Sequence, residues 1–259
     1  MFALLRLYEN TNDQDGWKSN EGWDRKAVAR LTEDHRRRLE VIDFWTGVTV
    51  TSGRLSHLSL VGNNLHGPLP IEFFLNLVHL KELNLSRNTL TGVVPEMLSG
   101  LKSLTWLDLS ENRLSGKLPK SIGTLSGLKV INFSGNTLTN LLPSTLNRLI
   151  DLRELHCDRN DLCGELPAVF AEGLRYCEEL KIIDISCNPR LGNVERFQCI
   201  LRMMLPGCSI FVGSAKIGSK EHVQSFGEVE AVRRIVDPKQ LEPLDEDSWE
   251  LAFKPPWES

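Results

Sequence analysis

Apolar and polar residues alternate in short stretches that recur along the middle of the chain. In the stretch that begins at Leu80, apolar side chains stand at the first, fourth and sixth positions, which are Leu80, Leu83 and Leu85. This spacing, close to a period of two, predicts a short strand that is buried on one face. So short a strand cannot bury that face by itself, so neighbouring copies must cover it.

The stretches are copies of one repeat. Five segments align without gaps and start 24 or 25 residues apart: LSHLSLVGNNLHGPLP from Leu55, LKELNLSRNTLTGVVP from Leu80, LTWLDLSENRLSGKLP from Leu104, LKVINFSGNTLTNLLP from Leu128 and LRELHCDRNDLCGELP from Leu152. A sixth copy, LKIIDISCNPRLGNV, begins at Leu180 after a longer interval. The apolar stretch 205–212 predicts a closing strand. A fixed period of this length predicts a stack of equivalent turns.

Two polar features of the repeat have a structural explanation. The ninth position is Asn in every copy, and an amide side chain offers donors and an acceptor to the backbone groups that a turn leaves unpaired. We therefore expect a ladder of stacked side chains formed by Asn63, Asn88, Asn112, Asn136, Asn160 and Asn188. The proline that ends each of the first five copies fixes an extended backbone before a short helix or turn leads back.

The repeats resemble those of the leucine-rich repeat family. They match the pattern L-x-x-L-x-L-x-x-N-x-L, and the continuation G-x-L-P resembles the subtype of plant receptor-like proteins. The resemblance covers residues 55–212. It implies an α/β fold, a right-handed solenoid with a parallel inner sheet and with short helices or turns on the convex side.

The two ends of the chain differ from the repeats. Residues 1–54 resemble the N-terminal helical cap of the same family, although the segment around Trp45 lacks the flanking cysteines of the receptor members. Residues 213–259 form an acidic tail with 6 basic and 10 acidic residues, which accounts for the net charge of −4. This tail either folds back on the last repeat or acts as a linear docking peptide.

Side chains at positions three, five, seven and eight of each repeat are expected to point outward from the inner sheet. Those that the repeat pattern does not explain are the candidate binding residues of the concave face: His57, Glu82, Arg87, Trp106, Glu111, Val130, Glu154, His156, Arg159 and Ile182. Trp106 lies near the middle of the array, and exposed aromatic residues often dominate protein interfaces. Trp106 is the expected anchor of a partner; the alternative is that it only covers the sheet.

The sequence contains no motif for catalysis, a cofactor or a metal ion. A phosphate loop, a nucleophile elbow and a paired-histidine metal motif are all missing. His156 and Asp184 occupy the same position in adjacent repeats, about 5 Å apart at the spacing of neighbouring strands. Without a nucleophile or an enclosed pocket, we interpret this pair as part of a binding face and expect no enzyme, no cofactor and no metal site.

All six cysteines lie from residue 157 onward. Cys157 takes an inward position that Leu occupies in other repeats, which predicts a small core residue. Cys199 and Cys208 are either free thiols or, in an oxidising compartment, a disulfide. The spacing of the cysteines does not match a zinc site.

These features predict a non-catalytic recognition or scaffold module in signalling that binds a protein or peptide on its concave face. The alternative is a secreted or cell-surface protein, receptor-like, that recognises molecular patterns or inhibits hydrolases. A basic footprint for nucleic acid is missing, and no stretch has the roughly 20 apolar residues that span a membrane. The sequence as written has no secretion signal, so we expect a cytoplasmic protein, or a secreted or cell-surface one if the N-terminus is truncated. The oligomeric state is not indicated.

Overall fold

The computed structural model describes residues 2–12, 16–19, 23, 45–75 and 77–213. The chain divides into two compact units, Met1–Lys216 and Ile217–Ser259. The second unit lies outside the described residues, as do almost all of the expected acidic tail and residues 24–44 of the expected cap. Below, repeats 1 to 6 are those that begin at Leu55, Leu80, Leu104, Leu128, Leu152 and Leu180.

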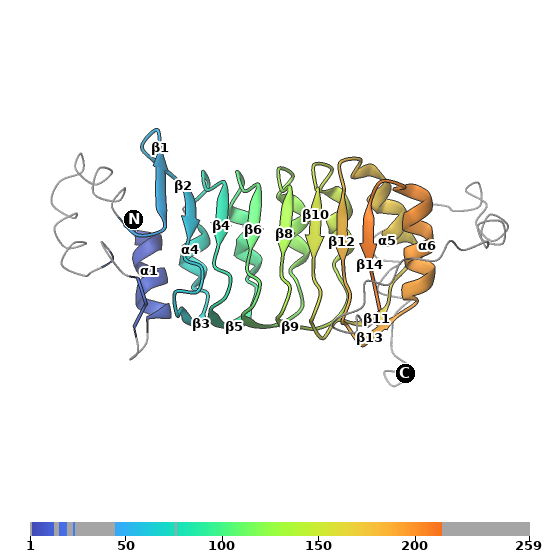
Figure 1. The fold of residues 1–259 in the computed structure, drawn as a ribbon. Helices are drawn as coiled ribbons and strands as arrows, with labels where there is room; N and C mark the ends of the chain where they lie inside the picture. Colours follow the sequence, from blue (N-terminus) through green and yellow to red (C-terminus); the bar gives the residue numbers. More distant parts are fainter. Residues whose placement is uncertain (1, 13–15, 20–22, 24–44, 76, 214–259) are drawn as a thin grey trace, which may run out of the picture. The chain divides into compact units, whose positions relative to one another are not determined.

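Eight strands form the inner sheet, and they follow one another in chain order (Figure 1). They are β1 (Val48–Thr51), β2 (Arg54–Ser59), β4 (Glu82–Asn84), β6 (Trp106–Asp108), β8 (Val130–Asn132), β10 (Glu154–His156), β12 (Ile182–Asp184) and β14 (Ser209–Phe211). From β2 onward each strand is parallel to the next. The described helices lie on one side of this sheet or at the ends of the array, and the arrangement confirms the expected α/β repeat solenoid.

The first pair of strands differs from the expected parallel sheet. β1 and β2 are antiparallel and form a hairpin. Ser52 and Gly53, which connect them, have φ of 52° and 73°, as a tight two-residue hairpin turn requires. The hairpin adds a strand that belongs to no repeat, and this strand pairs with the N-terminal edge of β2.

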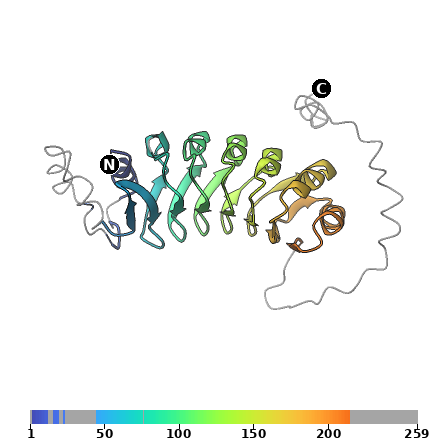
Figure 2. The ribbon, with the colours of Figure 1, turned by 90° about the horizontal axis from the view of Figure 1, so that it is seen from above.

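The prolines of the repeats are followed by short helices on the outer side of the sheet (Figure 2). These helices are α4 (Ile71–Leu75), η1 (Glu96–Gly100), η2 (Lys120–Thr124), η3 (Ser144–Arg148), α5 (Ala168–Gly173) and η4 (Leu174–Tyr176). Pro95, Pro119, Pro143 and Pro167 each precede a helix with an extended backbone. The face of the inner sheet that the outer helices leave open is called the concave face.

Short strands between the inner sheet and the outer helices were not predicted from the sequence. β3 (His66–Pro68), β5 (Thr89–Val93), β7 (Arg113–Gly116) and β9 (Thr137–Leu138) form a second sheet, and β11 (Cys163–Glu165) pairs with β13 (Arg190–Gly192). They coincide with the G-x-L-P part of the repeats or precede it directly. Their pairing is parallel and gives neighbouring turns a second line of backbone hydrogen bonds.

Helices close the two ends of the core. At the N-terminus, α1 (Phe2–Thr11) buries Leu4 and Leu7, beside an aromatic cluster of Tyr8, Trp17, Trp23 and Trp45. At the other end, α6 (Val194–Met204) buries Phe197, which stacks on Phe170 of α5. These contacts cover leucines that would otherwise end the stack exposed to water.

The ninth-position Asn side chains join each repeat to the one before it. In repeat 3 the Oδ1 atom of Asn112 accepts a hydrogen bond from the backbone N–H of Leu90 at 3.0 Å, and its Nδ2 donates to the carbonyl of Leu85 at 3.0 Å. Repeats 2, 4, 5 and 6 repeat this pattern. In repeat 1 the backbone of Ser19 takes the place of a preceding turn, since it exchanges two hydrogen bonds with Asn63.

Candidate functional site

The third positions of the repeats form one row across the concave face. Strand register aligns them from repeat to repeat as His57, Glu82, Trp106, Val130, Glu154 and Ile182. Trp106 is 41% exposed in the middle of this row, and it is one of the large apolar side chains that the fold leaves open to water. At the N-terminal end, His57 Nε2 lies 3.5 Å from Glu82 Oε1.

One candidate of this row is buried. Val130 is only 7% exposed, although its position predicted an accessible side chain. The strand register places it between Trp106 and Glu154, whose longer side chains flank it on the adjacent strands. Val130 therefore supports Trp106 and contributes little surface of its own.

A polar hollow of about 400 Å³ lies beside this row, along the C-terminal ends of the strands. It is lined by Val61, Asn84, Ser86, Arg87, Asp108, Ser110, Glu111, Asn132, Ser134, His156, Asp158 and Arg159. Four of the predicted candidates, Arg87, Glu111, His156 and Arg159, thus line the hollow. The other six lie on the third-position row, so the structure divides the candidates between two adjacent strips.

The eighth position of repeats 2, 3 and 5 places a side chain in the hollow. Arg87, Glu111 and Arg159 have φ of 57°, 52° and 52°, a left-handed conformation that glycine takes in repeats 1 and 4. The Glu111 carboxylate binds the Arg159 guanidinium at 2.8 Å, although the two residues are separated by a whole repeat. A Cβ atom on Gly135 would lie 2.8 Å from this carboxylate, so the glycine leaves room for the ion pair.

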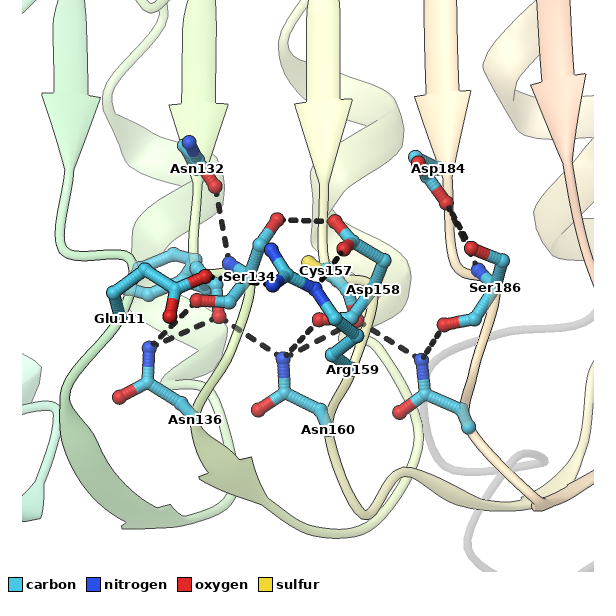
Figure 3. A network of polar contacts seen from close by, with 12 residues as sticks. Glu111, Asn132, Ser134, Asn136, Cys157, Asp158, Arg159, Asn160, Asp184 and Ser186 are labelled. Carbon is cyan, nitrogen blue, oxygen red and sulfur yellow. Dashed lines mark hydrogen bonds and ion pairs between the residues drawn. The ribbon is translucent and has the colours of Figure 1, made fainter. Parts of the chain in front are cut away.

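Repeat 5 departs from repeats 2, 3, 4 and 6 at its fifth and seventh positions. Repeats 2, 3, 4 and 6 have Asn or Asp at position five and Ser at position seven. In three of them the Ser hydroxyl donates to the Asn or Asp of its own repeat, as Ser186 does to Asp184 at 2.7 Å. Repeat 5 has His156 and Asp158 instead, and Ser134 of repeat 4 donates to Asp158 (Figure 3).

His156 and Asp184 lie on adjacent strands in register, as their spacing predicted. The structure adds Asp158, which the sequence analysis did not select. One imidazole nitrogen and one oxygen of each carboxylate all lie within 4.8 Å of one another. The signal that could have found Asp158 is the loss of the consensus Ser at position seven, where an acidic residue cannot donate the usual hydrogen bond.

Arg159 is held between two carboxylates. Its Nε atom donates to Asp158 at 2.8 Å, and its other contact is the ion pair with Glu111. The hydrogen bond to Asp158, and then the negative charges of Asp158 and Glu111, raise the pKa of Arg159 above its ordinary value. The Arg159 guanidinium of the hollow therefore already has two carboxylate partners within the protein.

A serine, a histidine and a glutamate also lie close together on the neighbouring strands β2 and β4. Ser56 Oγ is 2.8 Å from His57 Nδ1, whose ring contacts Glu82 through the other nitrogen. Ser56 is 3% exposed, and its hydroxyl donates to the carbonyl of Thr49 at 3.1 Å. A substrate cannot reach a hydroxyl that is buried and already committed as a donor, so this arrangement is structural.

All six cysteines lie within the described residues, and none of them, Cys199 and Cys208 included, forms a disulfide in the structure. Cys157 and Cys177 are fully buried in the core. Burial raises the pKa of Cys157 far above its ordinary value and that of Cys177 to about 11. Neither thiol is available as a nucleophile, because a buried thiol with a raised pKa stays protonated.

Within the described ranges of the chain, no helix is both long enough and apolar enough to cross a bilayer.

Comparisons with known proteins agree with the repeat pattern. One leucine-rich repeat family model matches residues 53–114 and a second matches residues 127–149. No curated protein sequence matches the chain. The solved ectodomain of BIR2 from Arabidopsis thaliana is 29% identical over 60% of this chain and 80% of that chain, with a TM-score of 0.54.

Two larger receptor ectodomains share the fold. The ectodomain of the plant membrane receptor kinase GASSHO1/SCHENGEN3 from Arabidopsis thaliana, solved in complex with CASPARIAN STRIP INTEGRITY FACTOR 2, is 23% identical over 83% of this chain and 29% of that chain, with a TM-score of 0.59. The ectodomain of the Arabidopsis receptor kinase HAESA, solved with an IDA peptide hormone ligand, is 19% identical over 72% of this chain and 40% of that chain, with a TM-score of 0.52. At these identities the likeness is one of fold. The repeat pattern, the solenoid and the family matches together show that the chain belongs to the leucine-rich repeat family, in its plant type.

Proposed function

We propose that the chain recognises a peptide or protein partner on its concave face, without catalysing a reaction. The observation that carries the proposal is the exposure of Trp106, 41% in the middle of the inner sheet and beside the polar hollow. When a partner covers a large aromatic side chain on an open sheet, burial of its apolar surface stabilises the complex. Such residues are frequent hot spots of interfaces.

The two strips of the concave face suit the chemistry of a polypeptide. Trp106 offers apolar contact, while the hollow offers the amide of Asn84 and the guanidinium of Arg87. A peptide in an extended conformation presents apolar side chains and backbone polar groups side by side. The solved HAESA ectodomain holds a peptide hormone ligand, which is a precedent within the same fold.

The described part of the chain supports binding better than catalysis. The hydroxyl of Ser110 donates to Asp108, and that of Ser134 donates to Asp158, so neither faces a histidine as a nucleophile would. His156 contacts Glu154 at 3.2 Å. A nucleophile, a base and an enclosed site do not come together there, and those are what a hydrolytic mechanism needs.

Peptide selection tests the concave face directly. A random peptide library is selected on the full chain, and the affinity of the selected peptides is measured for the wild type and for Trp106→Ala. We expect Trp106→Ala to weaken binding by at least about 1 kcal/mol, roughly fivefold, because the peptide loses its aromatic contact. Circular dichroism would show that the variant keeps the wild-type thermal unfolding.

Tyr176 provides the matched control. It is an exposed aromatic residue of η4, on the outer side of the sheet, and Tyr176→Ala should leave peptide affinity unchanged. Affinity that falls for Tyr176→Ala and not for Trp106→Ala would place the binding surface on the outer face and overturn the proposal.

A receptor-like role outside the cell is the second candidate, and the likeness to the BIR2 ectodomain favours it. Both candidates use the concave face in the same way. They differ in compartment, and therefore in the redox state expected for Cys199 and Cys208.

A further inference from the structure

Three potential metal ligands meet on the concave face where repeats 5 and 6 adjoin. His156 of β10 and Asp184 of β12 are partners in the strand register, and Asp158 follows His156 by two residues. The candidate ligand atoms of these half-buried side chains lie within 4.8 Å of one another, so small side-chain rotations would let each reach one shared ion at the roughly 2.0–2.2 Å of a metal–ligand bond.

The repeat fold does not require these residue types at these positions. In repeats 2, 3 and 6 an Asn or Asp at position five accepts a hydrogen bond from the Ser at position seven of the same repeat. Repeat 5 replaces both members, so it gives up that internal hydrogen bond and gains an imidazole and a second carboxylate. The exchange places both beside Asp184, an acidic residue at position five.

The contacts around His156 favour a metal ligand. Its Nε2 atom lies 3.2 Å from Glu154 Oε2, and a carboxylate that accepts the Nε2 proton leaves the Nδ1 lone pair for a metal. Metal-bound histidines commonly have such a carboxylate behind them, which fixes the ring and strengthens the ligand. Glu154 has this role in the proposed site.

The local charge favours a cation. Arg159 is shared between Glu111 and Asp158, so one guanidinium already faces two carboxylates. Within the described residues Asp184 forms no ion pair, and the ion pair of Glu154 is the one with His156. Glu154, Asp158 and Asp184 therefore leave an excess of negative charge around the imidazole, which attracts a cation.

We propose that His156, Asp158 and Asp184 bind one divalent transition-metal ion, such as Mn²⁺ or Zn²⁺. One nitrogen and two carboxylate oxygens are a ligand set that both ions accept. Three protein ligands leave coordination positions that open onto the concave face, for water or for an oxygen atom of a partner. His156 and Asp158 also line the hollow proposed for peptide recognition, but metal binding is measured without a peptide, so failure of the metal site leaves that proposal untouched.

Electron paramagnetic resonance of Mn²⁺ tests the site in the full chain. The protein is treated with a chelator, dialysed and titrated with Mn²⁺, whose free concentration gives the signal. Mn²⁺ is the better probe here because it prefers oxygen and imidazole to thiolate, so the six cysteines do not compete. We expect one Mn²⁺ per chain, with an affinity that Asp184→Asn and His156→Gln each weaken by at least about tenfold.

Asp108→Asn is the matched control, since Asp108 has the same position in repeat 3 and the same bond to its serine but lies outside the cluster. It should bind Mn²⁺ like the wild type. Arg159→Gln should tighten Mn²⁺ binding by about threefold or more, because it removes a positive charge that contacts Asp158. Arg87→Gln, at the same position of repeat 2, should not.

Absence of bound Mn²⁺ in the wild type at millimolar concentration would overturn the proposal. So would an affinity that Asp184→Asn and His156→Gln leave unchanged. If those two variants do not fold, Arg159→Gln decides: tighter binding supports the site, and unaltered binding contradicts it.

Discussion

At the scale of single residues, the stability of the array depends on amides that are almost completely buried. Asn88, Asn112, Asn136 and Asn160 are each at most 8% exposed, and their side chains bond the backbone of two repeats. A shorter side chain leaves backbone groups without partners in a place that water does not reach. Such a loss costs more than the net contribution of the hydrogen bonds themselves.

Asn112→Ala should therefore lower the free energy of unfolding by about 3 kcal/mol. The variant leaves the N–H of Leu90 without its acceptor and removes donors to the carbonyls of Leu85 and Leu109. Urea unfolding followed by circular dichroism measures the change. Asn10→Ala, on the exposed side of α1, is the control and should stay within about 0.5 kcal/mol of the wild type. Equal losses in the two variants would contradict a special role of the ladder.

The candidate site was predicted only in part, for reasons that belong to single residues. Arg87, Glu111, His156 and Arg159 were found because they break the repeat pattern, and they line the hollow. The burial of Val130 could not be read from its own position, because it depends on the lengths of side chains on the two adjacent strands. Asp158 was missed because its importance comes from Asp184 in the next repeat.

At the scale of elements, glycines set how closely the outer helices approach one another. A Cβ atom on Gly123 of η2 would lie 2.3 Å from the carbonyl oxygen of Thr145 in η3, and one on Gly100 of η1 would lie 2.7 Å from that of Phe74 in α4. Real Cβ atoms do not come so near to a backbone oxygen. The spacing of the outer layer therefore depends on a missing side chain at these two contacts.

Gly123→Ala should destabilise the protein by about 1–3 kcal/mol, since the new methyl group overpacks a contact between two backbones. Gly127→Ala is the matched control four residues later: its Cβ atom would meet only the carbonyl of Leu104 at 3.7 Å, an ordinary contact. Differential scanning fluorimetry compares the two. A melting temperature for Gly123→Ala equal to that of Gly127→Ala would show that the helices can move apart without cost.

The elements were predicted to different extents. The inner strands follow from the apolar alternation, and β14 lies inside the closing stretch 205–212. The short outer strands β3, β5, β7 and β9 were missed, because Gly, Pro and Thr give them no alternation and only the register of neighbouring turns pairs them. The antiparallel β1 was missed for a similar reason, since the repeat pattern does not extend into it.

At the scale of the whole molecule, each repeat is stabilised by its neighbours. The leucines of adjacent turns share one continuous core from α1 to α6. In such an array the interior opens when the packing between turns is lost, because no turn has a core of its own. The rate at which a reagent modifies a buried group therefore measures how readily the array opens.

Chemical labelling of the native cysteine thiols measures this opening without any mutation. At pH 8, iodoacetamide should label the half-buried Cys163 and Cys199 first, and should reach Cys157 and Cys177 only in denaturant. Burial shields these two and raises the pKa of Cys177 to about 11, so at pH 8 the reactive thiolate is scarce. Cys208, whose pKa burial also raises to about 11, should react slowly. Peptide mass mapping after timed labelling measures the order, and fast labelling of Cys157 in the native protein would contradict a closed array.

The same mapping on protein taken from its own source separates the two compartments. Free Cys199 and Cys208 are expected inside the cell, whereas a bridged pair favours the receptor-like candidate.

The Asn ladder also bears on how a gene of this kind can change. Every ladder hydrogen bond reaches the same turn or the adjacent one, so duplicating or deleting one complete unit leaves no backbone group orphaned. A deletion of repeat 4 would keep the fold yet bring Glu111 one turn nearer to Arg159 and Trp106 one turn nearer to His156. Lineages can therefore vary the distance between an aromatic anchor and a polar cluster in steps of one strand spacing, about 4.8 Å, without redesigning the core.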